Sequence, residues 1–326
     1  MNRMITLNKA ALLLKQMDAV IILTHQYPDG DTLGSGFALC RLLRAMGKKA
    51  NVLVCGDLPL KFAYMARGLS CQPFEGGHVV SVDVADEALL GENRGQFSGR
   101  VELCIDHHAS NKAFAKYIYV DSTAAATAEI IYQLAQLLGV EIDQETADCI
   151  FTGIATDTGC FRYANTTPRT HHIAAQMMER GARAADINRV MFDTKSRRRI
   201  RIEKSVLETM EFYAQGRCAV VCITNQMMTD SGATEDETEG LSSLPRQVEG
   251  VCIGITVKQK EDGGYKISVR TTQGYNAGTL CAQFGGGGHQ AAAGCSMTGT
   301  LAQVKEQIVQ AACKMLENHA LKQPEE

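Results

Sequence analysis

Short apolar segments alternate with amphipathic ones along roughly the first 140 residues, and this alternation constrains the fold most strongly. The apolar segments predict β-strands over 19–23, 50–55, 79–82 and 101–105. Amphipathic segments predict helices over 7–17, 33–46 and 124–138, the last ending at Gly139. Because short strands that alternate with helices usually pair in parallel, we predict an α/β fold whose parallel sheet carries helices on both faces.

Acidic and histidine residues follow several of these apolar segments. Ligands of open α/β sheets gather at the carboxyl ends of the strands, so residues at these positions are expected to form one cluster. A further acidic segment lies between two glycines, after Ile150 and Phe151, and we expect it to belong to the same cluster. The residues concerned are His25, Asp29, Asp31, Asp83, Asp106, His107, His108 and Asp157.

Each of these segments also has an ordinary structural explanation. Pro28–Asp31 has good turn chemistry, and Asp83 is placed to cap a helix. Asp106–His108 is compatible with a hydrogen-bonded loop, and Asp157 with a turn between Gly153 and Gly159. Together, however, carboxylates and imidazoles without a thiolate suit Mn²⁺ or Mg²⁺. Two such ions side by side are a common device for hydrolysing phosphate esters.

The second half of the chain has a different pattern. Strands are predicted over 217–224, 251–258 and 265–270, with a hairpin turn at Asp262–Gly264 and a helix over 300–317. A basic run with helical spacing, Lys195–Lys204, precedes them and is expected to connect two domains. Its charges are compatible either with a solvated helix face or with a basic surface that helps to attract an anionic substrate. We therefore predict domains at 1–190 and 216–320, joined by a helical connector at 191–215.

Composition excludes several classes of protein. A length of 326 residues suggests two domains, and a net charge of −3 gives no general attraction for long nucleic acid. The 12 cysteines contain no C-x-x-C pair, which favours reduced thiols in the cytoplasm over zinc or disulfide frameworks. No signal peptide and no membrane-spanning segment are expected, so the predicted location is cytoplasmic.

Two motifs carry a resemblance to a known family. The triplet Asp106-His107-His108 resembles the motif that names the DHH phosphoesterase superfamily. The run Gly285–His289, followed by Ala291–Gly294, resembles the glycine-rich motif of the DHH-associated C-terminal domain. The resemblance covers nearly the whole chain and is greatest for the oligoribonuclease (nanoRNase) and pAp phosphatase branch. It implies an active site in the cleft between the two domains.

The resemblance also implies a role for each polar residue. His25 and Asp29 would bind one metal, while Asp31, His107 and Asp157 would bind the other. Asp83 would bridge the two ions. Asp106 would orient a neighbouring group, and His108 would face the scissile phosphate. The implied cofactors are therefore two divalent ions, with Mn²⁺ expected and Mg²⁺ an alternative.

The second domain is expected to bind the rest of the substrate. Glycine lets a backbone approach a phosphate closely, and successive N–H groups form an anion site, although a flexible loop is the plain alternative for Gly286, Gly287 and Gly288. Arg270 at a strand end offers a planar fork for phosphate. By resemblance, Arg270 and His289 hold a non-scissile phosphate or nucleotide.

The implied function is hydrolysis of short RNA oligonucleotides to mononucleotides and of 3′-phosphoadenosine 5′-phosphate (pAp) to AMP. Cyclic or linear dinucleotide messengers are alternative substrates. A catalytically silent nucleotide-binding regulator is an alternative from another class, because a fold does not by itself imply activity. The sequence leaves the oligomeric state open, a homodimer being one option.

Overall fold

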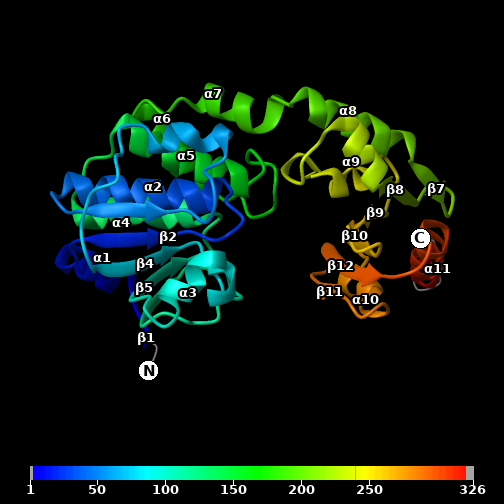
Figure 1. Cartoon of the computed structure of the whole chain (residues 1–326), viewed down its shortest axis with the longest axis horizontal. Helices are drawn as coiled ribbons and strands as arrows, with labels where there is room; N and C mark the ends of the chain where they lie inside the picture. Colours follow the sequence, from blue (N-terminus) through cyan, green and yellow to red (C-terminus); the bar gives the residue numbers. More distant parts are fainter. Residues whose placement is uncertain (1–2, 239, 321–326) are drawn as a thin grey trace. The chain divides into compact units, whose positions relative to one another are not determined.

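The computed structural model describes residues 3–238 and 240–320. Its contacts divide the chain into two compact units, Met1–Thr194 and Lys195–Glu326, and each is described by itself (Figure 1). The division into 1–190, a connector at 191–215 and 216–320 stays a prediction.

The first unit is built on a six-stranded sheet in the order β1-β6-β5-β4-β2-β3, with every neighbouring pair parallel. This confirms the predicted parallel sheet, although β1 and β6 were not predicted. The strands are β1 Arg3–Met4, β2 Val20–Leu23, β3 Ala50–Leu53, β4 His78–Val82, β5 Leu103–Asp106 and β6 Tyr117–Val120.

Both faces of this sheet are covered. Ile22 and Ile105 belong to the core shared with α1, α2, α4 and α5, whereas Leu23 and Cys104 pack on the other side with Leu90 of the η2–α3 segment. Strands buried on both faces explain why the sequence shows continuous apolar runs. The helices are α1 Leu7–Gln16, α2 Gly30–Ala45, η1 Leu60–Ala66, η2 Glu87–Asn93, α3 Arg94–Phe97, α4 Thr127–Leu138, α5 Gln144–Asp157, α6 Pro168–Glu179, α7 Ala184–Asn188 and η3 Arg189–Asp193.

Helix α5 corrects one expectation. Asp157 is the last residue of this helix rather than part of a turn at a strand end. The glycine that suggested a loop, Gly153, lies inside the helix, where a Cβ atom would come within 2.8 Å of Asp31 Oδ1 and 2.6 Å of Ala128 Cβ. Close packing against neighbouring helices therefore outweighs the low intrinsic helix propensity of glycine.

The second unit contains a mixed six-stranded sheet in the order β11-β12-β10-β9-β8-β7. Strands β8 and β9 are parallel and the other pairs are antiparallel. The three predicted strands and the turn at Asp262–Gly264 are confirmed, with Gly264 N donating to Asp262 Oδ1 at 2.9 Å. The strands are β7 Glu211–Tyr213, β8 Cys218–Ile223, β9 Ile253–Gln259, β10 Tyr265–Thr271, β11 Gly287–Gly288 and β12 Ala292–Met297.

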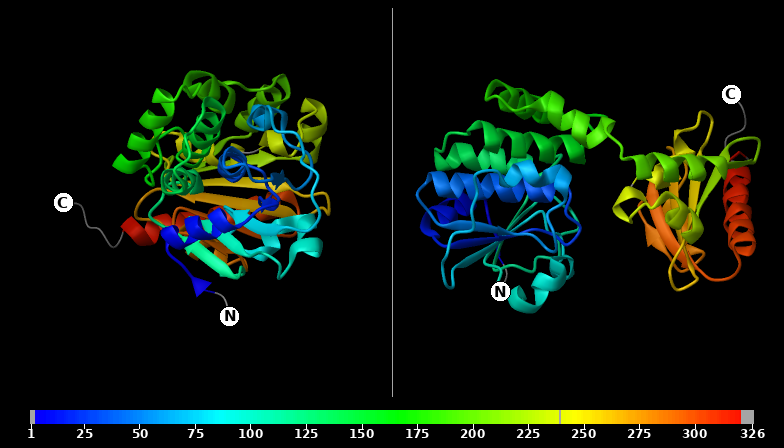
Figure 2. Two further views of the ribbon diagram at one scale, coloured as in Figure 1. Left: turned by 90° about the vertical axis from the view of Figure 1, so that its left-hand side faces the viewer. Right: turned by 45° about the horizontal axis from the view of Figure 1, so that its top comes forward.

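Helices cover both faces of this sheet as well. Helix α11 packs on one face through Val304 and Ile308 (Figure 2). The basic run forms helix α8, whose Ile202 and Val206 pack with Val221 on the opposite face. The helices of this unit are α8 Arg197–Glu208, α9 Asn225–Ser231, η4 Asp236–Thr238, η5 Leu241–Ser243, η6 Pro245–Gln247, α10 Ala277–Ala282 and α11 Leu301–Ala320.

The cysteines are free thiols, and seven of them are buried, as expected for small apolar side chains. Within residues 3–238 and 240–320, no helix combines the length and apolar character required to cross a bilayer. The cytoplasmic location and the homodimer stay predictions.

Candidate metal centre

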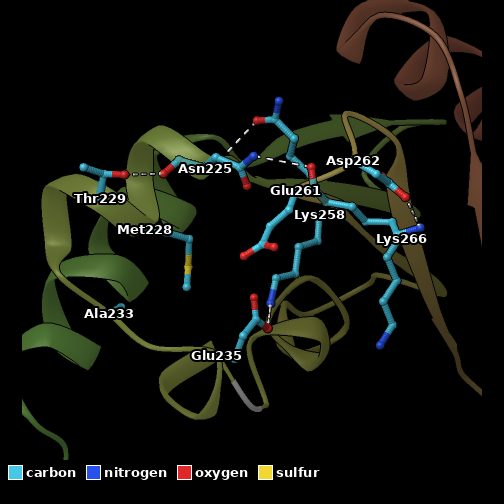
Figure 3. Close-up of a pocket in the computed structure, with 11 residues that line it drawn as sticks. Asn225, Met228, Thr229, Ala233, Glu235, Lys258, Glu261, Asp262 and Lys266 are labelled. Atoms are coloured by element: carbon cyan, nitrogen blue, oxygen red, sulfur yellow. Dashed lines mark hydrogen bonds and ion pairs between the residues drawn. The ribbon is translucent and has the colours of Figure 1, made fainter.

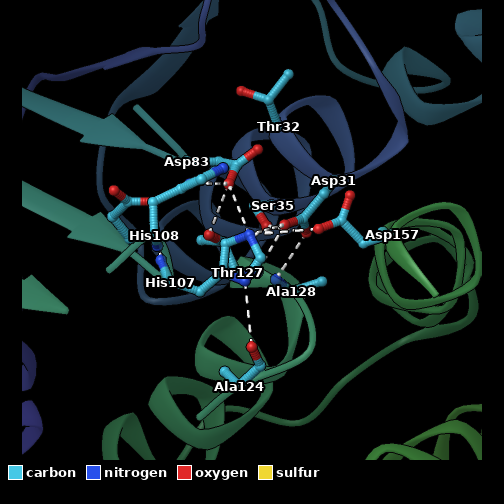
Figure 4. Close-up of polar contacts among 12 residues, drawn as sticks. Asp31, Thr32, Ser35, Asp83, His107, His108, Ala124, Thr127, Ala128 and Asp157 are labelled. Atoms are coloured by element: carbon cyan, nitrogen blue, oxygen red, sulfur yellow. Dashed lines mark hydrogen bonds and ion pairs between the residues drawn. The ribbon is translucent and has the colours of Figure 1, made fainter. Parts of the chain in front are cut away.

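The ends of β2, β4 and β5 and the adjoining ends of α2 and α5 bring the predicted polar residues of the first unit together. Figure 4 shows five of them, Asp31, Asp83, His107, His108 and Asp157. Three groups of side chains offer ligand atoms that lie within 4.8 Å of one another. Two of them coincide with the two sets predicted from the sequence, whereas the assignment of each residue to a particular ion stays a prediction. The groups are His25/Asp29/Asp83, Asp31/His107/Asp157 and Asp83/His107/His108.

Asp29 begins helix α2 and faces His25. Its Oδ1 accepts the backbone N–H groups of Asp31 and Thr32, both at 3.0 Å, as an N-cap residue does. Oδ2 lies 3.4 Å from His25 Nε2. Burial disfavours the charged imidazolium, but contacts with Asp29 and Asp83 outweigh it and raise the pKa of His25 to about 10. Asp29 therefore caps α2, where the sequence suggested only a turn as the alternative, and its second oxygen stays available.

Asp31 is completely buried at the N-terminus of another helix. Its Oδ2 accepts the N–H of Thr127 at 2.6 Å, and its Oδ1 accepts that of Ala128 at 2.9 Å, both in the first turn of α4. The positive end of a helix favours an anion there. Burial, followed by repulsion from Asp83 and Asp157, nevertheless raises the pKa of Asp31 well above its usual value. A cation beside these carboxylates would relieve that repulsion.

Asp83 lies between the two groups. Its Oδ2 is 3.6 Å from His25 Nε2, and its Oδ1 is 3.6 Å from His107 Nε2. The backbone has φ of 59°, a left-handed conformation that aspartate tolerates better than most residues. Strained backbone of this kind is typical of functional sites. The position supports the predicted bridging role.

His107 supplies the clearest sign of a metal site. Its Nδ1 lies 3.1 Å from the carbonyl oxygen of Ala124, which places a proton on Nδ1 and a lone pair on Nε2 in the neutral ring. Nε2 is buried and has no hydrogen-bond partner among the described residues. It faces carboxylate oxygens of Asp157, Asp83 and Asp31 at 3.3, 3.6 and 3.9 Å. An orphaned imidazole nitrogen among carboxylates fits a divalent cation.

Protons compete for the same nitrogen. Burial disfavours the charged form of His107, but the contact with Asp157 and the charges of Asp31 and Asp83 outweigh it. The result is a pKa of about 10 for His107, whereas burial raises the pKa of Asp157. Cation binding must therefore displace protons from this centre.

Asp106 holds the DHH triplet in place. Its Oδ1 accepts the backbone N–H groups of His107 and His108 and the His108 Nδ1–H at 2.8 Å. Its Oδ2 accepts from Asn111 Nδ2 at 2.6 Å. With Nδ1 engaged, His108 has only Nε2 left for other partners, on a side chain that is 42% exposed. Both predicted roles, orientation by Asp106 and phosphate contact by His108, stay predictions that this geometry supports.

Comparison with known proteins gives the family. The model of the DHH family, N-terminal domain, matches residues 19–154, and that of the DHHA1 domain matches residues 216–318. A Thermus thermophilus protein, "Bifunctional oligoribonuclease and PAP phosphatase NrnA", is 36% identical over 92% of this chain and 91% of its own length. The chain belongs to the DHH family. The predicted resemblance is confirmed.

Further relatives agree with this DHH assignment. A Bacillus subtilis protein of the same name is 26% identical over 86% of this chain and 90% of its own length. An exopolyphosphatase-related protein from Bacteroides fragilis shares the fold, with a TM-score of 0.83 at 24% identity and 96% coverage of both chains. An exonuclease RecJ structure bound to manganese has a TM-score of 0.53 at 16% identity and 94% coverage of both chains.

The role of Asp106 in this DHH domain leads to a first prediction. Asp106→Ala removes the acceptor for His108 Nδ1 but no predicted metal ligand, so kcat is expected to fall about 10- to 100-fold with metal content unchanged. Steady-state kinetics and elemental analysis of the purified variant measure both quantities. Asp57→Ala, at an exposed position, is the control. Loss of bound metal together with activity would contradict a purely orienting role.

The predicted residues of the DHHA1 unit lie on either side of β12: Arg270 pairs with Ala292, whose carbonyl oxygen accepts the His289 N–H at 2.8 Å. Arg270, on β10, is half-buried, and its Nη1 donates to the carbonyl of Val269 at 3.1 Å and its Nη2 to Ser242 Oγ at 3.4 Å. Burial lowers the pKa of Arg270. Among the described residues no carboxylate forms an ion pair with it. A partly desolvated cation without an acidic partner is suited to an anionic ligand.

The glycine run is partly a strand. Gly287 and Gly288 form β11, which pairs with Gly294 and Ala293 of β12, so a flexible loop is the wrong description for these residues. A Cβ atom added at Gly288 would lie 2.6 Å from Ala293 Cα, so this position requires glycine. A Cβ atom added at Gly287 would have no other atom within 4 Å. His289, at the end of β11, is exposed. Phosphate binding by Gly286, Gly287, Gly288 and His289 stays a prediction.

A separate groove in the DHHA1 unit holds none of the predicted site residues. It encloses about 1040 Å³ beside α9 and the β9–β10 turn (Figure 3). Its charges largely compensate one another, because Lys258 pairs with Glu235 and Lys260 pairs with Asp262. Such a lining offers little attraction for an anionic substrate.

Proposed function

We propose that this DHH protein is a phosphoesterase that hydrolyses short RNA oligonucleotides to mononucleotides and pAp to AMP. The observation that carries the proposal is the cluster of carboxylates and imidazoles in which Asp83 lies between His25 and His107. The activity for which the 36% identical Thermus thermophilus relative is named supplies the substrate class.

Two divalent cations, with Mn²⁺ proposed and Mg²⁺ the alternative, would supply Lewis-acid activation of water and of the phosphoryl oxygens when bound. In this proposal His25 and Asp29 would hold one ion, the remaining ligands would hold the other, and Asp83 would serve both. Those remaining ligands are Asp31, His107 and Asp157.

Of the other residues of the DHH triplet, His108 acts on the substrate and Asp106 positions His108. Asp106 accepts the His108 Nδ1–H at 2.8 Å, and this hydrogen bond raises the pKa of His108. A protonated ring held in this way can donate its Nε2–H to a phosphoryl oxygen, where negative charge develops during attack. Asp106 thus keeps the ring oriented and favours its charged form.

Arg270 is proposed to bind a non-scissile phosphate, with help from His289 and the glycine run. Arg270→Ala is expected to raise KM for pAp about 10- to 100-fold, because a hydrogen bond to a charged group contributes about 1.5–3 kcal/mol. Its kcat should change little. Lys266→Ala removes one positive charge from the same strand at an exposed position and is the matched control. An unchanged KM in the Arg270 variant would contradict this role.

The decisive experiment compares four substrates in the presence of Mn²⁺: pAp, pApA, a longer RNA and cyclic di-AMP. Rapid AMP release from pAp and pApA by the wild-type protein, absent in Asp83→Ala, is the expected result. Preference for cyclic di-AMP would instead assign the protein to dinucleotide turnover. Absence of turnover with all four would favour a binding protein and overturn the proposal.

A further inference from the structure

The chain reverses direction directly after Asp157 in an unusual backbone conformation. Gly159, Cys160 and Phe161 are three consecutive left-handed residues, with φ of 55°, 58° and 63°. The left-handed region costs a non-glycine residue about 1–2 kcal/mol. Two such residues in succession require compensating contacts, and strain of this kind is concentrated at functional sites.

Contacts at both ends of this turn supply the compensation. The Phe161 ring stacks on His171 at 5.2 Å between centroids and also packs against Phe151 at 6.1 Å. At the far end, Asn165 Nδ2 donates to the carbonyl oxygens of Asp157 and Ala125, both at 3.1 Å. The loop 158–165 is therefore closed onto the backbone that carries a predicted metal ligand.

The reversal places an aromatic ring over the backbone of the turn. A Cβ atom on Gly159 would lie only 2.3 Å from Tyr163 Cζ, so the ring of Tyr163 occupies the space beside this glycine. The Tyr163 N–H donates to the carbonyl of Thr158 at 3.0 Å. Tyr163 is nevertheless 59% exposed. Its ring thus packs against Gly159 and is accessible to solvent.

This ring is also close to the metal centre. Tyr163 is two residues from Asn165, whose side chain is bonded to the Asp157 carbonyl at 3.1 Å. Two residues span at most about 7 Å of chain. The aromatic surface therefore lies within the reach of a nucleotide whose phosphate would be bound by an ion at Asp157 and its neighbours.

We propose that Tyr163 is the stacking surface for the nucleobase of the nucleotide whose phosphate is hydrolysed. The inference rests on the proposed function and adds a base-recognition residue to it. Stacking on an aromatic ring accepts every base, because each base has a π face. A ring already held by Gly159 loses little conformational entropy on binding. The chain would thereby favour nucleotides over phosphate esters that lack a base.

Steady-state kinetics on pAp and on its abasic analogue, a ribose 3,5-bisphosphate, test the inference. Tyr163→Leu is expected to raise KM for pAp about 10- to 100-fold, because the loss of stacking with one base typically weakens binding by about this factor. KM for the abasic analogue should stay unchanged. Tyr163→Phe keeps the ring and should behave as the wild type on both substrates. Thermal unfolding checks that the variants are folded.

A second variant gives a reading that does not depend on turnover. The chain contains no tryptophan, so Tyr163→Trp introduces a single tryptophan at the proposed site, which can be excited selectively over the tyrosines. AMP is expected to quench its fluorescence, whereas ribose 5-phosphate is not.

Three results would overturn the inference. An unchanged KM ratio in Tyr163→Leu, or equal losses in Tyr163→Leu and Tyr163→Phe, would exclude stacking while leaving the proposed function intact. Equal quenching by AMP and ribose 5-phosphate would do the same. Failure of the wild-type protein to release AMP from either pAp or pApA would instead remove the proposed function itself.

Discussion

Asp83→Ala is expected to lower kcat/KM for pAp by more than about 100-fold, because even residues behind metal ligands contribute 10- to 100-fold. The Asp83 carboxylate lies 3.6 Å from both His25 Nε2 and His107 Nε2, so one substitution removes an oxygen from each side of the centre. Product release from pAp, measured alongside the bound metal per chain, tests this expectation.

The fold should survive this substitution. Asp83 raises the pKa of Asp31 by repulsion, so its removal relieves a buried like-charge contact. Asp83→Asn is the companion variant, because asparagine also tolerates the left-handed φ of 59° and keeps nearly the same shape. Asp57→Ala controls for the loss of an exposed carboxylate. Activity above half of the wild-type value in the folded Asp83 variants would refute the shared role of this residue.

The metal-free protein is expected to lose stability as pH rises from 6.5 to 10. His25 and His107 have pKa values raised from 6.5 to about 10, so their stabilising contribution is complete below pH 6.5 and is lost as pH rises through 10. The raised pKa values of Asp31 and Asp157 act in the same direction, since their ionisation in the folded state becomes costly above the unfolded value of 3.8.

Thermal unfolding after chelation measures this effect. A loss of about 2 kcal/mol would lower the midpoint by about 4–8 °C for a protein unit of this size. Added Mn²⁺ should restore stability, by about 2.7 kcal/mol at 100 times its Kd, and more strongly at higher pH, where protons compete less. The same measurement with Mg²⁺ in place of Mn²⁺ tests the alternative ion. A midpoint of the metal-free protein that rises between pH 7 and 10 would contradict the assignment of this centre.

Local pattern was sufficient for much of the DHH unit. Strands β2, β4 and β5 are buried on both faces, which makes each a continuous apolar run that is visible without any knowledge of its neighbours. Asp83 and Asp106 directly follow or end such runs. The general rule that parallel strands present their carboxyl ends on one edge then predicts that these residues meet.

Other parts of the site depend on contacts between distant segments. Helix α5 was not predicted, because Gly153 suggests a loop until Asp31 and Ala128 are known to pack against it. The two N–H groups that Thr127 and Ala128 donate to Asp31 join residues almost a hundred positions apart. Nothing in the alanine-rich segment before α4 signals these bonds.

The sequence by itself determined the parallel sheet and the family, and it supplied the set of residues that we predict as metal ligands. Burial on two faces and short motifs are both visible in the order of neighbouring residues. Only the tertiary structure decided which of these polar atoms lie within 4.8 Å of one another and which carboxylate is held by the start of a helix. It also decided that the Tyr163 ring lies on Gly159, two residues after Asp157 in the chain. Distances of this kind arise from packing between segments far apart in the chain, and no local pattern encodes them.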